Sequence, residues 1–250
     1  MPIHRTLDAG VAVLGLDLGR GNAIDHAFID ALGAALDAAL ADGARALVIT
    51  GRGKVFCGGL DLVTIFEYDR VAMGRFVDAF DGVFRKVLAF PRPVVAAVNG
   101  HALAGGCILA MAADHRVAQP GPFQIGLNEV ALGIPFPAAA YEIARRATPD
   151  AAAPTVFLEG RRFSPEEAVA AGIVHRLADD VVAAATEQAR RFADNADDAV
   201  ADTKADLIAP ALARIEATSE AKRERFLDRW FSLDARVRIG ALRERLAKKY

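Results

Sequence analysis

Cysteine is scarce in this chain of 250 residues, which contains only Cys57 and Cys107. Two cysteines are too few for a disulfide framework, so we expect two small buried thiols and a cytoplasmic protein. Neither sign of charge dominates, because 30 Lys and Arg stand against 32 Asp and Glu, for a net charge of −2. The sequence thus lacks the basic field that attracts polyanions, and we expect no nucleic-acid partner.

Long apolar runs are also missing. The most apolar stretch, residues 93–113, is interrupted by Asn99, His101 and several glycines and prolines. A membrane-spanning helix needs a more uniform run of about 20 apolar residues, so we expect no membrane association. The first residues show neither the apolar core of a signal peptide nor an Arg-rich and Ser-rich transit sequence, which again favours the cytoplasm.

The sequence matches neither a dinucleotide-binding loop nor a metal-binding histidine pair. Gly51 and Gly53 follow an apolar segment, as in a dinucleotide-binding loop, but Phe56 occupies the position of the third glycine. The five histidines are far apart in the sequence and form no short-spaced pair of metal ligands. We therefore expect neither a dinucleotide site nor a metal site.

The pattern of apolar residues predicts a mixed α/β chain. Short apolar segments at residues 11–18, 46–50 and 94–98 indicate buried strands. Helices are predicted at residues 71–88 and 102–113, after Ser164, and through most of the chain from residue 179. Asp25 can cap a further helix that ends near Gly43, whose apolar stripe is formed by Phe28, Leu32, Leu36 and Leu40.

Two glycine-rich segments directly follow the second and third predicted strands. Residues 55–62 read VFCGGLDL, and residues 99–107 read NGHALAGGC and open a helix. Glycine lets the backbone approach another group closely, and two converging amide N–H groups can hold a developing oxyanion. Glycines at the ends of strands are also common in ordinary turns, so the residues alone leave both interpretations open.

Glu129 is the one carboxylate of an otherwise apolar segment, residues 125–134, which reads IGLNEVALGI. A carboxylate in apolar surroundings without a nearby cation has a raised pKa, which suits a general base near neutral pH. A glutamate on an exposed loop would give the same sequence pattern, so this interpretation also stays open. The next acid along the chain, Glu142, falls in a helical run, where we expect it on a solvated face.

These motifs, in this order, resemble those of the crotonase (enoyl-CoA hydratase/isomerase) family. Residues 56–62 are similar to its first oxyanion-hole motif, residues 95–107 to its second, and residues 124–133 to the segment with a catalytic glutamate. The resemblance implies that the amides of Leu60 and Gly105 form the oxyanion hole and that Glu129 is catalytic. It also implies that the substrate is surrounded by Gly58, Gly59, Asp61, Leu62 and Ile108.

The resemblance further implies an α/β spiral of repeated ββα units and a helical C-terminal region that mediates trimerisation. We therefore expect an acyl-CoA-binding core over residues 1–195 and an oligomerisation region over residues 196–250. A homotrimer, or a hexamer of two trimers, is the implied assembly. The substrate would be an acyl-CoA thioester, with no metal or redox cofactor.

Departures from the family pattern bear on the reaction. The hydratases have a second glutamate directly after the Gly-Gly-Cys run, where this chain has Ile108. An isoleucine can neither hold nor deprotonate water, whereas a single base suffices to move a double bond. The chain is thus most similar to Δ3,Δ2-enoyl-CoA isomerases, which convert 3-enoyl-CoA to 2-enoyl-CoA.

Two other functions stay open. A hydratase, hydrolase or lyase of the same family would need water held by another group, for which His101 and Asp61 are the candidates. A non-catalytic acyl-CoA-binding protein would keep the fold without the reaction.

Overall fold

Two β-sheets form the framework of the computed structural model, which describes residues 3–248. The larger sheet consists, in spatial order, of β1 (Ile3–Asp8), β2 (Val11–Leu16), β3 (Ala46–Thr50), β5 (Val94–Val98), β7 (His115–Ala118) and β10 (Arg176–Leu177). Apart from the antiparallel hairpin of β1 and β2, its strands are parallel. The smaller sheet consists of β4 (Val55–Cys57), β6 (His101–Leu103), β8 (Ile125–Gly126) and β9 (Arg162–Phe163).

The chain visits the two sheets in a repeating order. A strand of the larger sheet is followed by a strand of the smaller sheet and then by helix, as in β3 and β4, β5 and β6, and β7 and β8. The helices of these units are α2 (Leu62–Ile65), α3 (Arg70–Leu88), α4 (Gly105–Ala112), the short η1 (Val130–Leu132) and α5 (Ala138–Ala147). This arrangement confirms the predicted α/β spiral of ββα units.

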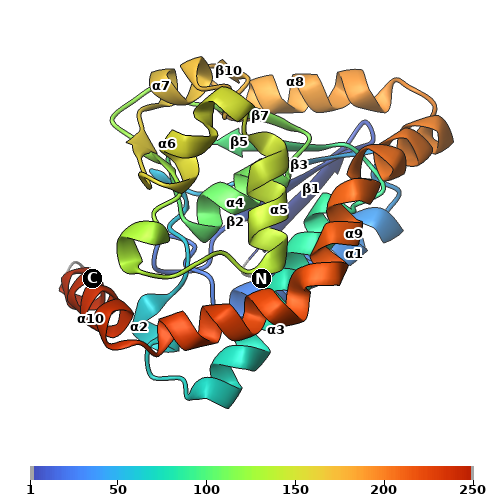
Figure 1. Ribbon diagram of the computed structural model, residues 1–250. Helices are drawn as coiled ribbons and strands as arrows, with labels where there is room; N and C mark the ends of the chain where they lie inside the picture. The colour runs from blue at the N-terminus through green and yellow to red at the C-terminus, as the bar shows by residue number, and fades with distance from the viewer. Residues whose placement is uncertain (1–2, 249–250) are drawn as a thin grey trace.

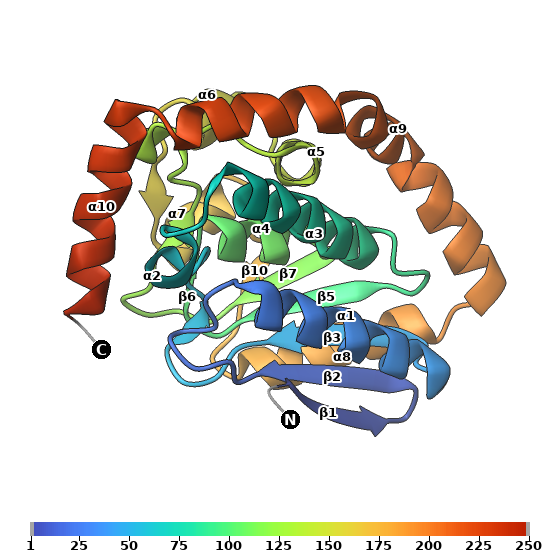
Figure 2. The same cartoon turned by 90° about the horizontal axis from the view of Figure 1, so that it is seen from below.

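The strands β2, β3, β5 and β7 divide their side chains between two apolar clusters, because successive side chains of a strand point to opposite faces. Val48 of β3 and Val95 of β5 pack against α8 (Val181–Ala193). Their neighbours Ile49 and Ala96 face the main core, which α1 (His26–Ala41), α3 and α4 cover. Figure 2 shows these helices on one side of the sheet and α8 on the other.

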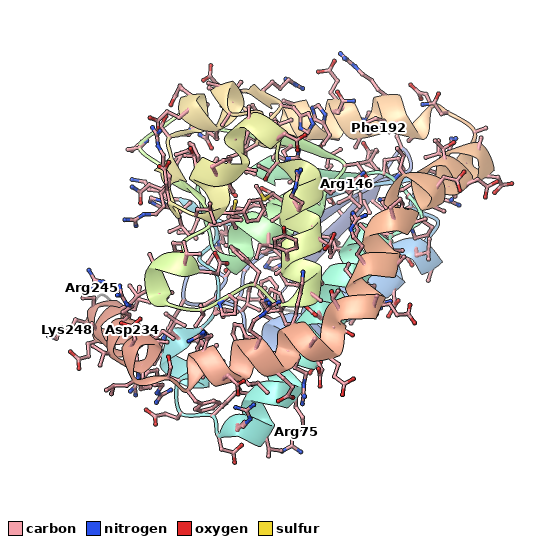
Figure 3. The ribbon with its side chains drawn as sticks, viewed as in Figure 1. Arg75, Arg146, Phe192, Asp234, Arg245 and Lys248 are labelled. Atoms are coloured by element: carbon pink, nitrogen blue, oxygen red, sulfur yellow. The ribbon has the colours of Figure 1, made fainter. Side chains whose placement is uncertain are left out.

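The C-terminal helices wrap around the same core. Figures 1 and 2 show α9 (Asp197–Trp230) passing along the outside of α5 and α3, and α10 (Leu233–Ala247) turning back beside α2. Phe226 and Trp230 are buried in the main cluster. At the start of α9, the buried Lys204 lies 2.6 Å from Asp114 and donates to the carbonyl of Arg92. The exposed side of α10 carries charged side chains, among them Asp234 and Arg245 (Figure 3), and also the apolar Leu233 and Val237.

The remaining short elements connect β8 to β10. They are η2 (Asp150–Ala152), α6 (Ala153–Phe157) and α7 (Pro165–Ala170). Ser164 and Glu167 form the capping box that the sequence indicates at the start of α7. In residues 3–248, no helix is both long enough and apolar enough to cross a membrane.

Three sequence-based expectations are wrong. Leu40 is 41% exposed, and Ala39 is buried in its place, because steps of four residues advance about 40° around a helix and leave the buried stripe. The helix predicted over residues 102–113 is split into β6 and α4. Glu142 is buried rather than solvated, and Arg214 and Lys222 of α9 form ion pairs with it at 2.7 and 3.7 Å.

Candidate active site

Three loops lie side by side at one end of the smaller sheet. Strand β6 pairs in parallel with β4 on one side and with β8 on the other. Parallel strands end at the same edge of a sheet, so the segments after them are brought together. These segments are residues 58–61, residues 104–106 and residues 127–129, which contain the main residues singled out in the sequence.

Glycine allows the first two loops to touch. Gly59 has a φ of +90°, and a Cβ there would lie 2.8 Å from the carbonyl oxygen of Leu103. A Cβ on Gly106 would lie 2.0 Å from the carbonyl oxygen of Cys57. No ordinary side chain fits at such distances, so these glycines set the spacing of the two loops.

Two asparagine side chains bind backbone groups that lie next to the first loop or in the turn before it. Asn99 accepts a hydrogen bond from the amide of Gly51 and donates to the carbonyl of Gly53, both at 2.9 Å. Asn22 donates to the carbonyl of Phe56 at 3.0 Å, at the base of the first loop. These bonds satisfy backbone groups that the short strands leave unpaired. The bonds of Asn99 hold the turn between β3 and β4, and that of Asn22 holds the start of the first loop.

The backbone amides of Leu60 and Gly105 are available for a ligand. Across residues 3–248, neither N–H donates to a protein acceptor. Gly105 opens α4, where the first amides have no partner within the helix. The preceding residue, Ala104, has a φ of +48°, which costs about 1–3 kcal/mol for a non-glycine residue. Its amide donates to the carbonyl of Gly126 at 2.9 Å, which helps to hold this turn.

Glu129 is buried beside these loops, with 6% of its surface exposed. Its Oε2 atom has no hydrogen-bond partner in the described chain. Burial raises the pKa of the carboxyl to about 7, because desolvation penalises the charged form more than nearby backbone amides stabilise it. The apolar setting read from the sequence is therefore observed, and the exposed-loop interpretation is wrong.

Two cavities meet at Leu60, Glu129 and Ile134, which line both. The outer one, of about 360 Å³, has polar residues in its wall, among them Arg20, His101 and Arg162. The inner one, of about 20 Å³, is lined by Gly105, Ile108, Ile134, Pro137 and Ala140 in addition to aromatic and valine side chains of α3 and α9. Among its lining residues, Glu129 is the only titratable one.

The other predicted substrate-binding residues divide between these features. Gly58, Asp61 and Leu62 line the outer cavity, and Ile108 lines the inner one. Gly59 lines neither and instead contacts the second loop. The structure thus brings all eight predicted site residues to one place, while the role of each stays a prediction.

Asp61 and His101, the alternative candidates for holding water, both form hydrogen bonds with the backbone. Asp61 caps α2 by accepting from the amides of Val63 and Thr64 and from the Thr64 hydroxyl. His101 accepts from the amide of Gln124 through Nδ1, so its neutral ring carries the proton on Nε2 and presents a donor rather than a base there.

The cysteines flank the loops without lining either cavity. Both are free and buried, as expected, and burial raises the pKa of each thiol to about 12. Such thiols are protonated and unreactive near neutral pH.

Sequence reasoning missed several residues of the site. Arg20 and Arg162 lie in loops or short strands without a motif, and only the fold brings them to the outer cavity. Phe76 and Phe80 are four residues apart on α3, a spacing that indicates only a buried helix face. They do lie on that face, and they also line the inner cavity. Leu242 and Leu246 of α10 line the outer cavity with the same spacing.

A ββα spiral with a buried carboxyl at the junction of two cavities is the arrangement of a crotonase-class enzyme. The chain belongs to the enoyl-CoA hydratase/isomerase family, whose model matches residues 6–248. The probable enoyl-CoA hydratase EchA17 of Mycobacterium tuberculosis is 35% identical over 209 residues, which cover 79% of this chain and 77% of that protein.

Solved structures include similar proteins described as isomerases. An enoyl-CoA isomerase of M. tuberculosis is 36% identical, with a TM-score of 0.84, over 90% of this chain and 99% of that one. The human mitochondrial Δ3,Δ2-enoyl-CoA isomerase is 25% identical, with a TM-score of 0.94, over 100% of this chain and 99% of that one.

Proposed function

We propose that this enzyme shifts the double bond of 3-enoyl-CoA thioesters to give 2-enoyl-CoA, with Glu129 as the single base. One observation carries the proposal: among the residues that line the inner cavity, Glu129 alone can transfer a proton. Ile108, which also lines it, stands where the resembling hydratases have a second glutamate. The raised pKa of Glu129, about 7, suits both steps, because the group must first accept a proton and then return it.

The reaction begins when Glu129 removes a proton from C2 of the substrate. The electron pair of the C2–H bond forms a C1–C2 double bond, and negative charge moves to the thioester oxygen. The free amides of Leu60 and Gly105 would donate to this oxyanion. Protonated Glu129 then returns the proton to C4, the dienolate collapses, and the new double bond lies between C2 and C3 in conjugation with the carbonyl. No other reactant is consumed.

The two cavities suit the two ends of such a substrate. The larger outer cavity would hold the coenzyme A arm, with Arg20 and Arg162 of its wall attracting the phosphates. The apolar inner cavity would hold the acyl tail. Coenzyme A is then part of the substrate, and the proposed reaction requires no metal or redox cofactor.

Hydration of 2-enoyl-CoA is the second candidate, because curated relatives such as EchA17 are named hydratases. Hydration needs a group that holds and deprotonates water, and neither Asp61 nor His101 is placed as a free base. A non-catalytic acyl-CoA-binding protein is the third candidate.

Turnover of the wild-type enzyme on each substrate distinguishes the three. Absorbance of the conjugated thioester should rise with 3-enoyl-CoA much faster than it falls with 2-enoyl-CoA. Equal rates would overturn the isomerase proposal in favour of a hydratase. Binding of acyl-CoA without turnover of either substrate would favour the non-catalytic protein.

A further inference from the structure

One side of the inner cavity is a wall of three aromatic residues and one valine, which we call the aromatic wall. Its residues are Phe76, Val77 and Phe80 of α3, and Phe226 of α9. Their exposed fractions do not exceed 4%. The cavity in front of the wall, about 20 Å³, is little more than the room that one water molecule needs. Beyond the reacting carbons, the acyl tail would therefore meet the wall almost at once.

Further aromatic rings support this wall from behind. The ring of Phe84 stacks on Phe80 with 4.0 Å between centroids, and Trp230 stacks on Phe226 at 5.7 Å. Phe84 and Trp230 are fully buried. A close-packed interior resists displacement, so the wall rings cannot swing back without moving these partners.

Ion pairs hold α9 against the helices that line the cavity. Arg70, at the start of α3, lies 2.8 Å from both Glu224 and Asp228 of α9. On the other side, Glu142 of α5 pairs with Arg214 and Lys222 of α9. Opening a passage between α3 and α9 for a long chain would therefore disturb aromatic packing and these ion pairs together.

We infer that the acyl pocket selects short-chain 3-enoyl-CoA substrates, such as 3-butenoyl-CoA and 3-hexenoyl-CoA, and that Phe80 sets the limit. This inference rests on the proposed function for the reaction, but the size of the pocket does not depend on it. Where a pocket accepts two more methylene groups, their burial raises kcat/KM by roughly tenfold or more. At this wall, two more methylene groups should lower kcat/KM instead of raising it.

The test is a series of 3-enoyl-CoA substrates with butenoyl, hexenoyl, octenoyl and decenoyl chains. For the wild-type enzyme, kcat/KM should peak at butenoyl or hexenoyl and fall at least about tenfold by decenoyl. Phe80→Ala should move the peak to a longer chain, and Phe90→Ala, which removes a buried ring outside both cavities, should leave it in place. If Phe80→Ala does not fold, Phe80→Leu makes a smaller opening in the same wall.

Calorimetric binding of saturated butyryl-CoA, hexanoyl-CoA and decanoyl-CoA separates this inference from the proposed reaction. Tighter binding of the short chains without isomerisation would overturn the function but support the pocket. A wild-type kcat/KM or affinity that keeps rising to the ten-carbon chain would overturn the inference and leave the isomerase intact. An unchanged profile in both folded Phe80 variants would overturn the assignment to Phe80.

Discussion

Glu129→Gln should inactivate the enzyme and stabilise its fold at the same time. Glutamine cannot accept a proton, and removal of a general base typically lowers kcat by about 10²–10⁴-fold. The stability effect follows from the rise in pKa from 4.5 in the unfolded chain to about 7 in the folded one. Such a difference corresponds to about 3 kcal/mol of destabilisation when the carboxyl is ionised, and glutamine removes it.

The effect on stability depends on pH with a definite sign. Because the folded-state pKa is the higher one, the carboxyl is neutral in both states below pH 4.5, and its burial as an anion costs nothing there. The cost grows between pH 4.5 and about 7 and is fully present above that. Urea denaturation should therefore show Glu129→Gln more stable than wild type at pH 8, with the advantage shrinking as the pH approaches 4.5.

A matched control is Glu142→Gln, which also neutralises a buried carboxylate, but one that has cationic partners. It should lower the free energy of unfolding at pH 8 instead of raising it. Two results would refute the reasoning for Glu129: a glutamine variant that keeps more than about a tenth of the wild-type turnover, or one that is no more stable than wild type at pH 8.

Other consequences of the site can be measured. Gly105→Pro should lower kcat by about 10²–10³-fold by removing the proposed oxyanion donor. Gly105→Ala keeps the amide, and its Cβ would lie 2.9 Å from the side-chain tip of Ile24 and 3.4 Å from the Phe80 ring. Equal rates in the two folded variants would exclude the amide. Ile108→Glu should introduce measurable hydration of 2-enoyl-CoA at some loss of stability, and no hydration by a folded variant would count against that position. Arg162→Ala should raise KM by up to about fivefold without changing kcat. Arg161→Ala is the control and should leave KM unchanged, because the Arg161 side chain pairs with Glu167. Light scattering should find the intact chain as a trimer or hexamer, and a monomer at micromolar concentration would contradict this.

The parts of the fold that the sequence predicts are those with long or strongly periodic patterns. The buried strands β3 and β5 and the helix α3 fall within one residue of their predicted bounds, because each combines an apolar pattern with a clear stop signal. The smaller sheet was missed, since its strands are two or three residues long and too short for any period. For that reason residues 102 and 103 of β6 were predicted as the start of a helix.

The candidate site follows the same division. Glu129 and the two glycine-rich loops were found because an isolated acid and paired glycines stand out locally. Glu142 was misjudged because its cationic partners lie on α9, more than 70 residues further along the chain. Arg20 and Arg162 were not predicted because exposed arginines carry no signal until the fold places them beside a cavity.

The contribution of Phe226, Leu242 and Leu246 to the cavity walls has a consequence for biosynthesis. The three loops and Glu129 are synthesised first, because they precede α9 and α10 in the chain. Until α9 and α10 follow, the apolar lining of the nascent site faces water or any chaperone that binds it. Glu129 and the three loops therefore exist before the helices that complete the cavity walls, and a chain truncated after residue 195 would lack these three apolar lining residues.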